Sequence, residues 1–257
     1  MIKFDFNDIL KWSEITGDTN PVHYIKTTGG YILPGMLVIC HLFTRLLNAK
    51  ITGEDALSVN IRFHKQTFTD RNYLLNNKDE TYVLEDLDSQ CFISMKRTVT
   101  QRKKDLNLGS QLELINFNNK EREAYKLRCS NRLPWLSNKN IYIISLSFFA
   151  LLNSRTFLRQ KGKKYTSAED YFNSSNTLVL GQTYTFTKEF IMETFRPTDI
   201  SVLIKDDILI PVAANKYIRQ ITCDVVHGNE VILSYSTTLQ ISEDIKDIRN
   251  DSERRNI

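Results

Sequence analysis

A helix that is apolar on almost every side is the sequence feature that most constrains this fold. It is predicted to begin at Pro34-Gly35-Met36 and to end near Asn48, with polar side chains confined to Thr44, Arg45 and His41. A helix with so little polar surface has to be enclosed by other elements. The rest of the chain must therefore supply a structure that wraps around this segment.

The spacing of apolar residues changes from a helical to a strand period after this helix. Residues 56–65, 73–76, 81–86 and 91–101 are predicted to be strands, and the last two are expected to pair as a hairpin around Asp88-Ser89. An antiparallel sheet that follows a buried helix can curve around it and form one core.

A shorter amphipathic helix precedes the buried helix. We expect Asn7 or Asp8 to cap its start and Gly17 to end it. Pro21 then keeps Asn20 out of the α region, so the chain turns after Gly17. The apolar face of this helix consists of Ile9, Trp12 and Ile15.

The second half of the chain repeats this order of elements. Residues 141–158 form a second strongly apolar helix candidate, and strands are predicted over 178–190 and 200–205. A hairpin is expected to pair 217–226 with 230–241 around His227-Gly228-Asn229. We therefore expect an α+β fold with two units, residues 1–108 and 109–245, joined edge to edge. Residues 246–257 are charged, poor in apolar side chains and expected to be a disordered tail.

Composition restricts the class of protein and its partners. The 257 residues suffice for two fused units. The net charge of +4 and pI of about 8.7 suit an acidic partner, such as coenzyme A phosphates or an acidic carrier protein, although solubility alone also explains them. Nothing resembles a nucleic-acid-binding module.

Location is predicted from the apolar runs and the cysteines. The most apolar run, Ile141–Leu152, is shorter than the roughly 18 residues that span a bilayer, so we expect no membrane segment. The N-terminus lacks the apolar core of a signal peptide. Scattered cysteines with no C-x-x-C spacing favour free thiols in a reducing, cytoplasmic setting; they are Cys40, Cys91, Cys129 and Cys223.

The stretch Gly17-Asp18-Thr19-Asn20-Pro21-Val22-His23 is the most informative part of the sequence. A carboxylate and an imidazole are suitable acid and base groups near neutral pH, and a bent turn can bring Asp18 and His23 within reach of one water molecule. Taken alone, Asp18 is better explained as a turn cap and His23 as an ordinary surface residue. The whole motif, just upstream of Pro34-Gly35-Met36, favours chemistry.

This arrangement resembles the MaoC-like hot-dog family, which includes (R)-specific enoyl-CoA hydratases and 3-hydroxyacyl thioester dehydratases. The matching residues are WSEITGDTNPVH followed by LPGMLVICHLF, and the resemblance covers about residues 5–105 well and 110–241 only as architecture. It implies a double hot-dog fold, with each sheet wrapped around a central helix. It also implies that Asp18 and His23 hold the catalytic water, and that neither a metal nor a redox cofactor is needed.

The start of the buried helix is predicted to be the oxyanion site. Its first N–H groups have no acceptor within the helix and lie at the positive end of the dipole. Gly35 permits close approach of a ligand, so we assign the oxyanion role to the N–H groups of Gly35 and Met36; relief of crowding is the other explanation of this glycine. Asn20 borders the substrate site and is expected to serve chiefly in the turn.

The expected reaction is hydration of 2-enoyl thioesters or dehydration of (R)-3-hydroxyacyl thioesters, carried by coenzyme A or an acyl carrier protein, in fatty-acid or polyketide metabolism. The alternatives are a double-bond isomerase or a thioesterase on the same fold, and a non-catalytic acyl-binding protein. Thioesterases of this fold usually carry a carboxylate on the central helix, and residues 36–48 contain none. The acyl chain, the carrier, the direction and the formation of a homodimer stay open.

The chain also departs from the family pattern. The segment between His23 and the central helix is short and contains Gly29-Gly30, and the family's usual Pro-Val-x-x-Gly-Asp strand after the central helix is missing. The motif lies in the first unit, where related double hot-dog hydratases often carry it in the second. Asp199 has no histidine at motif spacing, so we expect the second half to be structural or to line an acyl tunnel.

Overall fold

The structure, a computed structural model, describes residues 1–47, 55–101, 111–137, 140–192 and 199–242. Its main sheet has nine antiparallel strands in the order β4-β5-β6-β3-β10-β13-β12-β11-β7. The strands are β3 (Asp55–Phe63), β4 (Tyr73–Lys78), β5 (Thr81–Asp86), β6 (Cys91–Gln101), β7 (Glu113–Phe117), β10 (Asn176–Phe186), β11 (Ile200–Ala213), β12 (Lys216–His227) and β13 (Glu230–Ser242).

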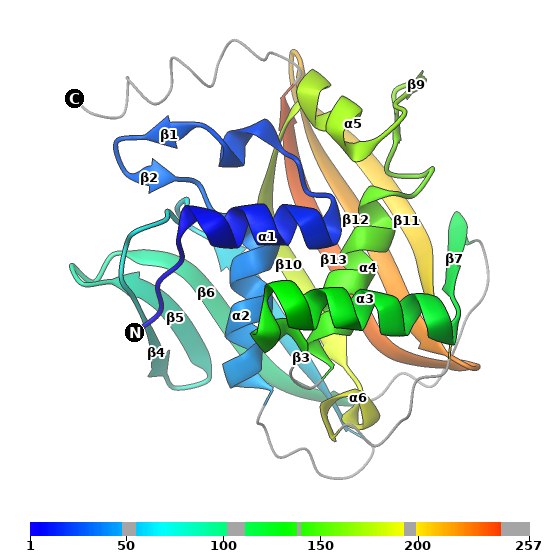
Figure 1. The fold of residues 1–257 in the computed structure, drawn as a ribbon, viewed down its shortest axis with the longest axis horizontal. Coiled ribbons are helices and arrows are strands. Elements are labelled where there is room, and N and C mark those ends of the chain that lie inside the picture. Colours follow the sequence, from blue (N-terminus) through cyan, green and yellow to red (C-terminus); the bar gives the residue numbers. More distant parts are fainter. Residues whose placement is uncertain (48–54, 102–110, 138–139, 193–198, 243–257) are drawn as a thin grey trace.

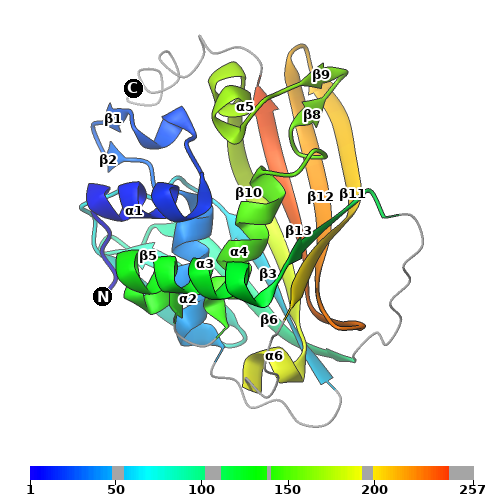
Figure 2. The ribbon, with the colours of Figure 1, turned by 45° about the vertical axis from the view of Figure 1, so that its right-hand side comes forward.

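Two layers of helices cover one face of this sheet. The helices α2 (Gly35–Leu46) and α4 (Ile141–Leu152) lie next to the sheet, and α1 (Phe6–Thr16) and α3 (Asn119–Arg132) cross over them on the outside (Figures 1 and 2). In α4 every residue except Phe149 is buried. Both inner helices are therefore enclosed, as the predicted lack of a broad polar face requires.

The order of elements is the same in the two halves. In each half a strand or bridge at a sheet edge is followed by an outer helix, a short 3-10 helix, an inner helix and four strands. The two sets of strands run outward from the β3·β10 pair, in which residues 57–62 face 181–186. This is a double hot-dog fold, as predicted. The expected boundary at residues 108/109 and the tail from 246 lie outside the described residues.

The first helix is as predicted except at its cap. Asp5, and not Asn7 or Asp8, is the N-cap, and it forms a reciprocal capping box with Asp8. Gly17 ends the helix with a φ of 72°, a conformation that glycine adopts without strain.

The inner helix of the second half ends earlier than predicted, at Leu152 and not at residue 158. The Glu113 carboxylate, from β7, accepts hydrogen bonds from the backbone N–H groups of Arg155 and Thr156. The buried guanidinium of Arg219, from β12, donates hydrogen bonds to the carbonyl oxygens of Thr156 and Phe157. These distant side chains satisfy backbone groups that a helix would otherwise pair, so the helix stops.

Other predicted bounds shifted or were missed. Residues 188–190 belong to α6 (Lys188–Met192) and not to the strand before it, and β11 extends well beyond residue 205. Elements that the sequence analysis did not predict are α3, β7, η1 (Pro21–His23), η2 (Pro134–Ser137), α5 (Ala168–Ser174) and the small strands β1 (Lys26–Thr27), β2 (Gly30–Tyr31), β8 (Arg159–Gln160) and β9 (Lys163–Lys164).

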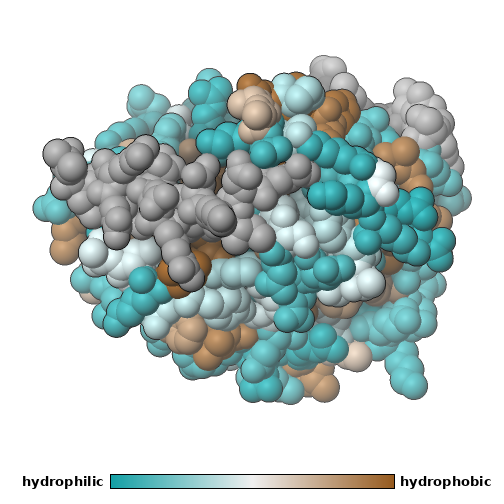
Figure 3. All heavy atoms as spheres, turned by 90° about the horizontal axis from the view of Figure 1, so that it is seen from above, coloured by the Kyte–Doolittle hydropathy of each residue, from teal (hydrophilic) through white to brown (hydrophobic). Residues whose placement is uncertain are grey.

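The face that carries β1, β2 and α5, at the top of Figure 1, is mostly hydrophilic. Hydrophobic side chains appear there in small separate groups (Figure 3). The β1–β2 hairpin packs closely on the chain behind it, since a Cβ on Gly30 would lie 2.9 Å from the carbonyl oxygen of Thr69. Gly30 is therefore required for this close approach.

Candidate active site

The side-chain amide of Asn20 stabilises the turn that follows α1 through both its oxygen and its nitrogen. Asn20 caps the 3-10 helix η1, because its Oδ1 accepts a hydrogen bond from the N–H of Val22 at 3.2 Å. Its Nδ2 donates to the carbonyl oxygen of Thr177, on β10 of the second half, at 2.8 Å. Asn20 is thus a turn-former, as expected, and it also ties the motif to the second unit.

The Asp18 carboxylate is buried in this turn and oriented by two donors. The indole Nε1–H of Trp12 donates to Oδ2 at 3.4 Å. The backbone N–H of Asn20 donates to Oδ1, also at 3.4 Å. Trp12 is fully buried and stacks on Phe148 of α4, with ring centroids 6.2 Å apart. The carboxylate therefore has a defined direction but only long hydrogen bonds.

The His23 ring is fixed on its other side. Its Nδ1 lies 3.0 Å from the carbonyl oxygen of Ile32. A carbonyl can only accept, so Nδ1 carries the proton and the neutral ring has its lone pair on Nε2. That Nε2 lies 3.9 Å from Asp18 Oδ2, too far for a direct hydrogen bond, and both side chains are more than nine-tenths buried. The two atoms are spaced so that one small oxygen ligand can contact both.

The surroundings keep His23 neutral. Burial lowers its pKa below the ordinary value of 6.5, and the nearby Asp18 carboxylate and the Ile32 carbonyl only partly oppose this effect. A neutral imidazole beside a carboxylate can accept a proton near neutral pH.

The start of α2 has no side-chain cap. Pro34 is its N-cap and provides no side-chain capping bond, so the first N–H groups of the helix have no side-chain acceptor. At Gly35 an added Cβ would lie 3.1 Å from Cζ of Phe63, on β3, and 3.7 Å from Cβ of Val179, on β10. Two strands, one from each half of the sheet, therefore flank this helix start.

The Met36 side chain points into the core and is buried. Its sulfur accepts hydrogen bonds from Nε2 of Gln182 at 2.9 Å and from the Tyr184 hydroxyl at 3.3 Å. The same hydroxyl lies 2.9 Å from Gln182 Oε1, so its single hydrogen is shared between these two acceptors. Only the backbone N–H of Met36 is left for the predicted role, and the network anchors the first turn of α2 to β10.

A short chain segment leads from the Ile32 carbonyl, which contacts the motif, to the start of α2. Ile32, which accepts from His23, lies three residues before Gly35, and the N–H of Leu33 donates to the carbonyl of Thr67. Of the predicted residues, the structure brings Asp18, Asn20 and His23 together in one turn. It places Gly35 and Met36 at the end of the segment that leaves this turn.

The remaining histidines lie elsewhere. His41 packs edge-on against Phe4 and Trp135, and His64 is exposed and bonded to Ser94. His41 is thus a packing residue and His64 a surface residue. Asp199 is exposed.

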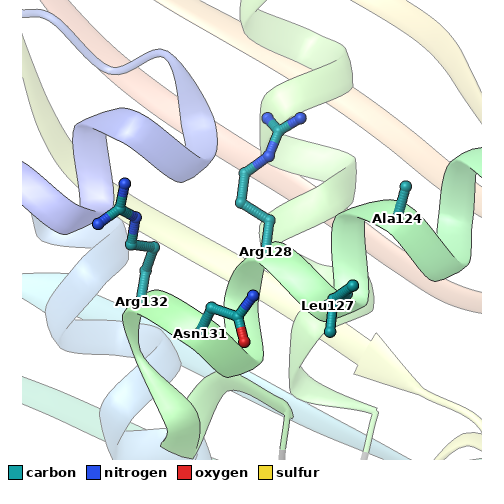
Figure 4. Close-up of a pocket in the computed structure, with 5 residues that line it drawn as sticks. All are labelled: Ala124, Leu127, Arg128, Asn131 and Arg132. Carbon is teal, nitrogen blue, oxygen red and sulfur yellow. The ribbon is translucent and has the colours of Figure 1, made fainter.

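A hollow of about 350 Å³ lies on the outer helix α3, lined by Ala124, Leu127, Arg128, Asn131 and Arg132 (Figure 4). None of the predicted site residues lines it. Arg132 is paired with Glu14 of α1 at 2.8 Å.

Three further features concern the described residues as a whole. Within it, every helix is too short or too polar to cross a bilayer. No cluster of three or more potential metal ligands occurs among the described residues. The four cysteines are free thiols.

No family model and no curated protein matches this sequence. Solved structures do resemble it over most of its length. It is similar to a MaoC-like dehydratase (9% identity, 93% of this chain and 94% of that chain, TM-score 0.46). It is also similar to a conserved hypothetical protein from Mycobacterium tuberculosis with a double hot-dog fold (10%, 93% and 93%, 0.48) and to an N-terminal dehydratase from the difficidin assembly line (8%, 93% and 96%, 0.45). These likenesses concern the fold alone.

Sequence reasoning missed three residues that border the motif. Trp12 was assigned only to an apolar helix face, although its indole contacts Asp18. Tyr24 was assigned no role; the Asp18 charge contributes to raising its pKa, after burial. Thr177 carries no sequence signal, because it follows the motif by more than 150 residues.

Proposed function

We propose that this chain is a hydro-lyase that adds water to 2-enoyl thioesters or removes it from 3-hydroxyacyl thioesters. The observation that carries this proposal is the buried pair Asp18 Oδ2 and His23 Nε2, 3.9 Å apart, with the histidine held in one tautomer by Ile32. Such a pair can hold one water molecule between a base and an anion. The resemblance of the motif to MaoC-like hydratases supports the same reaction.

In the direction of hydration, His23 Nε2 takes a proton from the water while the water oxygen forms a bond to the β-carbon of the substrate. The electrons of the double bond move to the thioester oxygen. The imidazolium then returns the proton to the α-carbon, so that water is added overall and His23 is regenerated. Asp18 accepts a hydrogen bond from the second hydrogen of the water, which stays on the oxygen as part of the 3-hydroxyl group, and it stabilises the imidazolium.

The negative charge on the thioester oxygen needs donors at a fixed place. The N–H groups of Gly35 and Met36 are the groups we assign to it, since α2 provides no side-chain cap for them. Phe63 and Val179 would flank the acyl chain there, because both lie next to Gly35. The reverse reaction uses the same groups in the opposite order.

Short-chain and medium-chain 2-enoyl thioesters of coenzyme A and of a carrier protein are the substrates to test. Hydration removes the ultraviolet absorbance of the conjugated thioester and raises the mass of the product by one water. Isomerisation removes the conjugation without a change in mass, and a thioesterase releases a free thiol. Each alternative activity therefore has its own signature in the same assay.

Asp18→Asn and His23→Ala are the variants that test the assignment. Both should lose the water-addition activity, and their thermal unfolding should show that they remain folded. Retained activity in both variants contradicts the proposal. So does a wild-type protein that adds no water to any of these thioesters.

A further inference from the structure

Thr177 is a buried polar side chain without a protein partner next to the motif. It lies on β10, in the second half of the chain, and only 7% of the residue is exposed. Its Oγ1 has no hydrogen-bond partner among the described residues. An unpaired buried hydroxyl is costly, so native proteins usually provide it with a ligand or a partner.

Two contacts fix where Thr177 lies. Its carbonyl oxygen accepts from the Asn20 side chain at 2.8 Å, and the N–H of Asn20 in turn donates to the Asp18 carboxylate. Two residues further along β10, Val179 lies beside Gly35. One end of this strand segment is therefore next to the acid–base turn and the other next to the start of α2.

Strand geometry places Thr177 and Val179 on the same side of the sheet, because side chains alternate along a strand. That side faces the helices, since Val179 faces α2. The two positions are separated by about 7 Å, or two strand steps. An acyl thioester lying along this segment would present its carbonyl oxygen near Gly35 and the substituent of its β-carbon near Thr177.

We infer that the Thr177 hydroxyl binds the oxygen on the β-carbon of the substrate, which is the attacking water before hydration and the 3-hydroxyl group after it. This inference rests on the proposed function. It makes Thr177 a specificity residue contributed by the second unit to the site of the first, and it assigns the substrate a direction along β10.

The expected ligand is thus a 3-hydroxyacyl thioester in preference to a saturated acyl thioester of the same length. A neutral hydrogen bond of this kind is worth about twofold to tenfold in affinity. The hydroxyl of Thr19 is also buried without a partner among the described residues, and it lies in the same turn as Asp18. It is the competing candidate for the same oxygen.

The test compares the dissociation constants of (R)-3-hydroxybutyryl-CoA and butyryl-CoA by calorimetry. Every protein carries Asp18→Asn to block turnover, alone or together with Thr177→Val, Thr177→Ser, Thr19→Val or Thr185→Val. Valine keeps the shape of threonine without the hydroxyl, and serine keeps the hydroxyl. Thr185 lies on the same strand at a position of the opposite parity to Gln182 and Tyr184, so it faces away from the helices and serves as the matched control.

The expected result is a preference for the 3-hydroxy ligand that Thr177→Val removes and that the Thr177→Ser and Thr185→Val proteins retain. A preference that survives Thr177→Val, or that only Thr19→Val removes, overturns the inference and leaves the proposed function standing. If the wild-type protein turns over enoyl thioesters but the Asp18→Asn protein shows no preference, the inference alone is wrong. If there is neither turnover nor preference, both proposals are wrong.

Discussion

The two halves of this protein share an order of elements but differ at one turn. Each outer helix leads to a 3-10 helix that begins with proline, Pro21 in the first half and Pro134 in the second. Counted from that proline, the positions of Asp18, Asn20 and His23 are occupied in the second half by the residues Asn131, Leu133 and Leu136. The second turn lacks the acid and the base, and its backbone also differs, because Asn131 is still part of α3 whereas Asp18 follows the end of α1.

The replacements explain how the second turn remains stable. Leu133 and Leu136 are buried in the core, and the equivalent positions of the first turn, Asn20 and His23, are buried polar groups that need partners. Apolar burial stabilises a turn without any partner. The polar side chains of the first turn, Asn20 and His23, instead depend on Thr177 and Ile32, which provide carbonyl acceptors.

The inner helices of the two halves also differ in their first residue. The first begins with Gly35, which has no side chain, and the second with Ile141, which is fully buried. Asn140, before the second helix, donates from its side chain to the carbonyl of Phe190. Neither inner helix has a side-chain cap. We predict one site per chain because the first turn carries Asp18 and His23 and the second turn does not.

The largest expected effect is a loss of kcat/KM from substitutions in the first turn but not in the second. His23→Ala or Asp18→Asn should lower kcat/KM for enoyl-thioester hydration by about 10²–10⁴-fold, because each removes one acid–base group. Asn131→Ala, at the position of the second turn equivalent to Asp18, should change it by less than about twofold. Equal losses from the two turns would contradict the functional difference between the halves.

A second comparison concerns the helix starts. Gly35→Ala should lower kcat by up to about 10²–10³-fold, the usual contribution of one oxyanion donor, because the methyl group blocks the approach of the thioester. Ile141→Val should lower the stability by about 1 kcal/mol and leave kcat unchanged. The double variant Gly35→Ala/Phe63→Leu gives the methyl group room. If it restores kcat as well as thermal stability, the loss came from crowding and not from the oxyanion site.

Substitution of the two tryptophans is expected to give a smaller difference in kcat. Trp12→Phe removes the indole N–H that orients Asp18 and should lower kcat by about three- to tenfold, as expected for one long hydrogen bond to a charged group. Trp135→Phe, in the 3-10 helix of the second half, should leave kcat unchanged. Steady-state kinetics on both variants test this, and an equal decrease in the two would assign the effect to packing.

The pH dependence of activity gives a further test of the first turn. Since burial lowers the pKa of His23 below 6.5, its neutral form persists to a lower pH than in an exposed histidine. The acid limb of kcat/KM is therefore expected below pH 6.5, where an exposed histidine would already be protonated. An acid limb above pH 6.5 would show that His23 is not the neutral base.

The smallest effect concerns stability. Burial lowers the pKa of His41 to about 4 from 6.5, so between these values the unfolded chain binds more protons than the folded one. Stability should therefore decrease as pH falls from 6.5 to 4, and His41→Phe should make this decrease shallower. Urea unfolding at pH 7 and pH 4.5 measures it, and an unchanged pH dependence would show that His41 contributes nothing.

Much of the fold was predictable because its signals are local. The apolar helices over 35–46 and 141–152, the strands that follow the first of them and the hairpin around His227-Gly228-Asn229 all follow from periodicity and turn residues. The helix α3 was missed although Asn118 and Glu121 form a capping box, a signal that is visible in the sequence. The early end of α4 was not predictable, because it depends on Glu113 and Arg219 from distant strands.

The sequence by itself determined that a carboxylate and an imidazole share one proline-bent turn, through the Gly-Asp-x-Asn-Pro-x-His spacing, and so named the pair to which we assign the proposed reaction. Only the tertiary structure decided their state and their surroundings. The tautomer of His23, the lowered pKa and the position of Thr177 beside the motif all require segments that meet only after folding. The physical reason is that turn geometry is a short-range property, whereas burial and hydrogen-bond partners are set by the whole packed chain.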